Sequence, residues 1–203
     1  MKKFINLFSY IFHPLFVGLY GTIMFFLLEG KWFQMQEIYF YLLQVLILTV
    51  LIPITLFYLL LSLGKITSFQ IANINERKFP LMINCLLFSI LIKTSFTIAT
   101  MPPLFFYFLG AIIASIVCWI LLFFDKKISL HSIGITSLTT FAIGLSIHLH
   151  THLIGTISFL ILSIGMVFSS RILMKAHHYS ELWAGFLIGI ITQIPLWFFW
   201  VGI

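Results

Sequence analysis

Two long apolar runs of the chain are separated by the polar stretch Ser170-Arg171-Ile172-Leu173-Met174-Lys175-Ala176-His177-His178-Tyr179-Ser180-Glu181. The stretch holds an arginine, two histidines and a carboxylate in a chain of which only 8% is charged. Such groups are costly in hydrocarbon, so beside apolar runs they lie at a water boundary or take part in chemistry. We therefore interpret residues 170–181 as the junction between two membrane-spanning segments.

The composition of the whole chain supports this interpretation. Of 203 residues, 62% are hydrophobic and 18% are aromatic, which is more apolar surface than a water-soluble core can hide. The formal net charge of +6 does not indicate a nucleic-acid partner, because the basic residues sit in short loops beside apolar runs, as the positive-inside rule expects. The lipid bilayer is the partner that this composition predicts.

The apolar runs divide into seven candidate spans, given that a helical span needs about 20 residues. Backbone hydrogen bonds must be satisfied within the segment in lipid, so we expect helices. The predicted spans are residues 11–28, 38–63, 80–100, 103–124, 129–148, 153–173 and 180–202, with Pro80 opening the third helix. The predicted fold is an all-α polytopic transmembrane helix bundle of six to seven spans, with residues 1–203 as one integral membrane domain.

Counting crossings places three polar clusters on one membrane face: residues 64–79, 125–131 and 171–181. Two spans lie between each cluster and the next, so the prediction follows from parity alone. Nine of the eleven basic residues share this face. The positive-inside rule then assigns the face to the cytoplasm, although charges that bind phosphate would be present for another reason.

The spacing of His177 and Glu181 predicts an oriented histidine. At i and i+4 on a helix the two side chains face the same way, so the carboxylate accepts a proton from one ring nitrogen and leaves the other free to attack. Arg171 has a planar fork suited to phosphate oxygens. The other two clusters add groups suited to phosphate: Arg77, Lys78, Lys127, Ser129, the backbone amide of Leu130, and His131.

These residues resemble the motifs of the type 2 phosphatidic acid phosphatases, which share their site with vanadium haloperoxidases. The third family motif is Ser-Arg, five residues, His, three residues, Asp, and Ser170-Arg171…His177…Glu181 fits every spacing with Glu in place of Asp. The second motif, Pro-Ser-Gly-His, is similar to residues 128–131, which keep Ser129 and His131 but not the proline and the glycine. The resemblance covers roughly residues 64–190.

The first family motif, Lys, six residues, Arg-Pro, is matched least well. Only Arg77-Lys78-Phe79-Pro80 resembles it, and Lys65, Lys78 or Lys127 would have to replace its lysine. The resemblance implies that His177 becomes phosphorylated, that Glu181 orients it, and that His131 protonates the leaving lipid alkoxide. It also implies that the phosphoryl oxygens are held by Arg171, Arg77, Lys127 and Ser129, with no metal and no cofactor.

The expected function is therefore a lipid phosphate or diphosphate phosphatase, in a bacterial inner membrane. A second hypothesis is a catalytically inactive relative that binds or moves an anionic lipid. A third is a histidine-based metal or proton transporter that uses His148, His150 and His152, which we predict to lie on the opposite face. The small-residue spacing of Gly185 and Gly189 predicts close packing of the last span against a neighbour.

Overall fold

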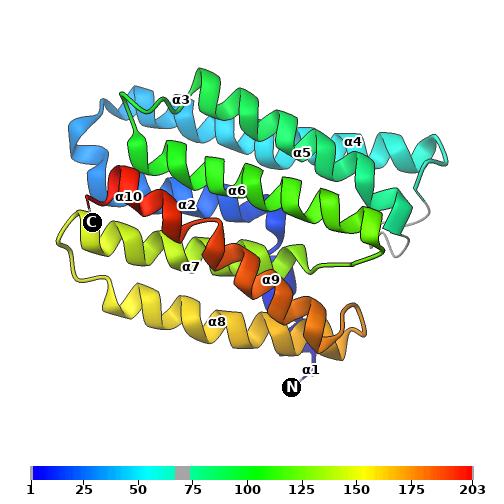
Figure 1. The fold of residues 1–203 in the computed structure, drawn as a ribbon. Coiled ribbons are helices and arrows are strands. Elements are labelled where there is room, and N and C mark those ends of the chain that lie inside the picture. Colours follow the sequence, from blue (N-terminus) through cyan, green and yellow to red (C-terminus); the bar gives the residue numbers. More distant parts are fainter. Residues whose placement is uncertain (1, 67–73, 203) are drawn as a thin grey trace.

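The computed structural model describes residues 2–66 and 74–202, and within these ranges the chain is helical and has no β-strand (Figure 1). The long helices are α1 (Lys2–Ile11), α2 (Pro14–Glu29), α3 (Met35–Leu46), α4 (Ile52–Ser62), α5 (Ile74–Thr94), α6 (Pro102–Leu121), α7 (Leu130–His148), α8 (Ile154–Leu173) and α9 (Tyr179–Ile191). Shorter elements are the 3-10 turns Gly30–Trp32, Leu122–Phe124 and Ile194–Leu196, the π-helical turn Ile47–Leu51, and α10 (Trp197–Trp200).

Six of the described helical segments are long and apolar enough to cross a membrane: Pro14–Trp32, Met35–Ser62, Pro102–Phe124, Leu130–His148, Ile154–Leu173 and Tyr179–Trp200. Helix α5 is also 21 residues long, about 30 Å at helical rise, and packs along α6, but it carries charged residues in its first and last turns. The chain is thus an integral membrane protein built as an all-α bundle, and the prediction of six to seven spans is confirmed.

The predicted first span begins differently in the structure. The helix breaks at Phe12 and His13, and α1 is a separate helix that packs along α8 rather than the start of a span. Pro14 stands at the first position of α2, where its missing N–H costs no helix bond. His13 caps this helix, since its Nδ1 accepts a hydrogen bond from the backbone N–H of Leu15 at 3.3 Å.

Both predicted ends of the third span, residues 80–100, were wrong. Helix α5 begins at Ile74, so Pro80 lies inside it, near the polar end, instead of opening it, and the helix ends at Thr94 rather than at residue 100. In the last span, the helix α9 ends at Ile191, and the chain continues through a turn that contains Pro195. Residues 67–73 of the predicted connection 64–79 lie outside the described ranges.

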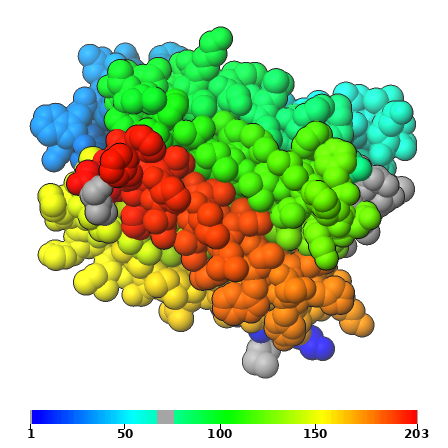
Figure 2. Space-filling view, in the orientation of Figure 1, coloured from blue at the N-terminus to red at the C-terminus, as the bar shows by residue number. Residues whose placement is uncertain are grey.

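Helix α7 is central in the bundle and packs against α2, α6, α8 and α9. Its contact with α9 is close because a Cβ on Gly185 would lie 2.8 Å from the carbonyl oxygen of Ser129, and one on Gly189 would lie 2.9 Å from that of Ile133. The predicted close packing of the last span is confirmed. Figure 2 shows the α9–α10 segment lying across the surface between α6 and α8.

The connections between the helices lie at two opposite ends of the bundle (Figure 1). One end of the bundle holds α1, the start of α5, the α6–α7 connection and the α8–α9 connection. The other end holds the α2–α3, α5–α6 and α7–α8 connections together with α10. The parity prediction is therefore confirmed for the described parts of all three polar clusters.

Candidate active site

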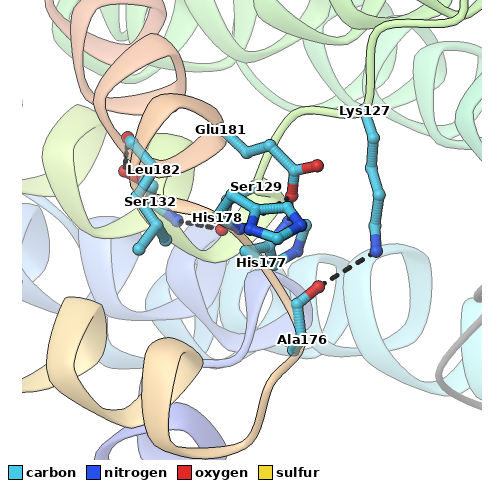
Figure 3. Close-up of polar contacts among 8 residues, drawn as sticks. All are labelled: Lys127, Ser129, Ser132, Ala176, His177, His178, Glu181 and Leu182. Carbon is cyan, nitrogen blue, oxygen red and sulfur yellow. Dashed lines mark hydrogen bonds and ion pairs between the residues drawn. The ribbon is translucent and has the colours of Figure 1, made fainter.

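His177 lies in the α8–α9 connection just before α9 begins, and its partner Glu181 is in the first turn of α9, so the two residues do not stand on one helix as predicted (Figure 3). His177 Nδ1 and Glu181 Oε2 are 2.5 Å apart, and the same oxygen accepts a hydrogen bond from the backbone N–H of His178 at 3.4 Å. A carboxylate only accepts, so Nδ1 is the donor and Nε2 keeps its lone pair. Glu181 therefore fixes both the orientation and the tautomer of the His177 ring.

The environment of His177 keeps its ring neutral. Its side chain is 3% exposed, and this burial lowers the pKa of His177 below its ordinary value, an effect that the hydrogen bond to Glu181 partly offsets. The nearby cations Lys127 and Arg171 act in the same direction as burial. A neutral ring with an available lone pair is the form that a nucleophile needs.

A cavity of about 300 Å³ opens beside this pair and has two kinds of wall. Its arginine and histidine residues come from separate segments of the chain: His13, Arg77, His131, Arg171 and His177. Its apolar walls come largely from α4 and α5, through side chains that include Leu56, Phe57, Leu60, Leu81 and Leu87. The cavity is thus amphipathic, with cationic and imidazole groups meeting a hydrocarbon surface.

Positive charge is concentrated around the cavity. Burial lowers the pKa of Lys127, and the charges of Arg77 and Arg171 lower it further while Glu181 opposes them. Three cations that feel one another's charge at one site favour a bound anion. Moreover, Arg171 Nε is buried without a hydrogen-bond partner among the described residues, which is the state of a donor that serves a ligand.

Of the predicted phosphate ligands, the cavity is lined by Arg77, Leu130 and Arg171, but not by Lys127, Ser129 or Lys78. The Lys127 ammonium donates to the carbonyl oxygen of Ala176 at 3.0 Å and so braces the connection that carries His177 (Figure 3). The ammonium of Lys78 lies 4.6 Å from the ring centroid of Phe123, a contact outside the cavity.

Ser129 does not line the cavity but connects the start of α7 to α9. It is fully buried, caps α7 by accepting a hydrogen bond from the Ser132 N–H at 3.4 Å, and donates its own N–H to the carbonyl oxygen of Glu181 at 3.3 Å. The hydroxyl of Ser132 adds a bond to the carbonyl oxygen of Leu182 at 2.7 Å. These bonds tie the start of α7, and therefore His131, to the start of α9, which carries Glu181.

His13 is a site residue that the sequence analysis missed. Its ring is nearly perpendicular to that of His131, with the centroids 5.0 Å apart, and both line the cavity. The signal in the sequence was a histidine directly before Pro14 in an otherwise apolar run, which is a position for a helix cap. That signal was hidden by treating residues 11–28 as one uninterrupted span.

The histidines of the α7–α8 turn lie at the other end of the bundle, as predicted. The ring of His148 packs against Trp200 with centroids 5.5 Å apart, and His150 has a left-handed backbone with φ of 48°. Within residues 2–66 and 74–202, no group of three or more His, Cys, Asp or Glu side chains is arranged to hold a metal ion.

Comparison with known proteins gives no relative for this chain: no protein-family model, no curated protein and no solved structure matches it. The function therefore has to be argued from the chemistry of the site.

Proposed function

We propose that this chain is a membrane lipid phosphatase of the type 2 phosphatidic acid phosphatase kind, resident in a bacterial inner membrane. It hydrolyses a lipid phosphate or a lipid diphosphate through a phosphohistidine intermediate. One observation carries the proposal: His177, oriented by Glu181 at 2.5 Å, lines the same cavity as His131, Arg77 and Arg171.

The proposed reaction has two steps at one phosphorus atom. His177 Nε2 attacks the phosphorus, the bond to the lipid oxygen breaks, and the leaving alkoxide takes a proton from His131, whose protonated form the bound phosphate dianion favours. His131 then takes a proton from water, the resulting hydroxide attacks the phosphohistidine, and the P–N bond breaks to release phosphate. Arg77 and Arg171 neutralise the phosphoryl oxygens, which carry the negative charge in both transition states.

The apolar walls of the cavity support a lipid substrate over a soluble one. A phosphate between the arginines would leave its organic group against the leucines and Phe57 of α4 and α5. A water-soluble phosphate ester would gain little from those walls, whereas an acyl or prenyl chain would bury apolar surface there.

The test compares two adjacent histidines. His177→Ala removes the nucleophile, and we expect phosphate release from lipid phosphates in proteoliposomes to fall to background. His178→Asn is the matched control, because this side chain is exposed and asparagine is a favoured helix cap. We expect this variant to stay within about threefold of the wild type. Loss of activity in both variants, or in neither, would contradict the assignment.

A trapping experiment separates a phosphatase from a relative that only binds anionic lipid. Acid-labile label from a lipid carrying ³²P-phosphate should appear on the wild type and not on His177→Ala, and activity should persist in excess EDTA. A protein that binds the labelled lipid but never forms the adduct would be the inactive relative.

A further inference from the structure

The α1–α2 junction places a third imidazole, that of His13, at the cavity, and this histidine belongs to none of the three motifs. Two hydrogen bonds fix the position of His13. One is its own cap of α2, and the other, of 2.6 Å, joins the hydroxyls of Ser9 and Ser170. Ser9 is one helical turn before His13, and Ser170 directly precedes Arg171. The serine pair therefore holds the α1–α2 junction against the end of α8 that carries Arg171.

The hydrogen bonding of His13 defines which nitrogen carries the proton. Nδ1 accepts from the backbone N–H of Leu15, so it bears no hydrogen, and a neutral ring then carries its hydrogen on Nε2. Burial, with a further contribution from the charge of Arg171, lowers the pKa of His13 to about 4. At neutral pH the ring is thus an uncharged donor with one N–H.

That N–H has no acceptor within residues 2–66 and 74–202, although His13 lines the cavity. Arg171, which also lines the cavity, has a buried Nε with no hydrogen-bond partner among the described residues. Most buried donors in folded proteins are paired, so the buried Nε of Arg171 calls for an acceptor in the cavity that His13 also lines. A group with several anionic oxygens satisfies both at once, which a single water molecule does less well.

We infer that His13 is a further phosphate ligand of this cavity, donating a hydrogen bond from Nε2 to an oxygen of the anion that Arg171 holds. The inference rests on the proposed function for the identity of the anion, a phosphate group. It requires only binding and not hydrolysis. His13 also backs the ring of His131, so the bound oxygen lies on the side of the site where the leaving group departs.

Two substitutions separate this role from the capping of α2. His13→Asn keeps an acceptor at the position of Nδ1 and so preserves the cap, but it removes the donor at the position of Nε2. His13→Gln keeps an amide donor near the position of Nε2 and removes the cap. Binding of inorganic phosphate and of orthovanadate to the detergent-solubilised full chain is measured by calorimetry, and thermal unfolding is followed for each variant.

We expect His13→Asn to weaken anion binding roughly 10- to 100-fold with an unchanged melting temperature, because a hydrogen bond to a charged group is lost. His13→Gln should bind within about fivefold of the wild type and melt at a lower temperature. Anion affinity of His13→Asn equal to the wild type would overturn the inference, as would equal loss of affinity in both variants.

The two proposals fail in different ways. A wild-type chain that binds phosphate through His13 but releases none from lipids would leave this inference intact and end the proposed function. If the wild type hydrolyses lipid phosphates while His13→Asn binds vanadate normally, the proposed function stands and the role of His13 as a phosphate ligand is contradicted.

Discussion

Two groups of three histidines lie at opposite ends of this bundle, and they differ in how the chain assembles them. His148, His150 and His152 are near neighbours in sequence, at the last residue of α7 and in the turn that leads to α8. His13, His131 and His177 are far apart in sequence, yet all three line one cavity with Arg77 and Arg171. Only the second group has the cavity, the cations and the carboxylate partner that a reaction on an anion needs.

The difference shows that spacing along the chain is a poor guide to a site unless the elements that carry it are known. Alternating residues in a turn point in different directions, and one of the three, His148, packs on Trp200. Helix ends that are separated by an even number of crossings, in contrast, meet at one surface whatever their distance in sequence. In a membrane protein the bilayer enforces this meeting, because each span must cross completely.

After His177, the largest effect on the histidine group that lines the cavity is expected at Arg171. Arg171→Ala should lower kcat/KM for lipid phosphates roughly 10²- to 10³-fold, the usual cost of removing one donor from a developing oxyanion. Arg171→Lys keeps the charge but not the planar fork, so it should recover only part of this loss. Initial rates across substrate concentrations in proteoliposomes measure both.

The control for Arg171 removes a charge from the same connection. Lys175 is exposed and has a left-handed φ of 52°, which asparagine tolerates. Lys175→Asn should therefore stay within about twofold of the wild type. A similar loss in Lys175→Asn and Arg171→Ala would mean that the connection needs positive charge in general rather than a phosphate ligand at Arg171.

Most of the spans and the end of the bundle that their connections share were predictable from the sequence, because hydropathy and parity depend only on where the apolar runs fall along the chain. The contact between His177 and Glu181 was also predicted, but from a shared helix that the structure does not have: His177 precedes α9 and meets Glu181 at the N-terminal end of that helix. What the sequence could not supply were interactions between distant segments. The approach of His13 to His131, the bonds of Ser129 to α9 and the carbonyl contact of Lys127 depend on how the helices pack together.

A smaller effect is expected from loosening the contact between α7, which carries His131, and α9, which carries Glu181. Gly185→Ala would place a methyl group 2.8 Å from the carbonyl oxygen of Ser129, so α9 must move away from α7. Overpacking of this kind costs about 1–3 kcal/mol, and we expect a lower melting temperature and a reduced kcat, because His177 and His131 then separate. Gly165→Ala on α8 is the matched control, since no atom lies within 4 Å of its Cβ. Equal stability and activity in both variants would show that the α7–α9 contact does not position the site.

The smallest effect is expected at the other histidine group, and it is the direct test of the transporter hypothesis. The triple variant His148→Gln, His150→Asn and His152→Gln removes every imidazole from the α7–α8 turn, and asparagine suits the left-handed φ of 48° at His150. Phosphate release should stay within about twofold of the wild type, because the turn lies at the opposite end of the bundle from His177. Proton and zinc flux into proteoliposomes are measured on the same preparations. The transporter hypothesis would be supported, and the phosphatase contradicted, if the wild type supports a flux that the triple variant loses and neither releases phosphate.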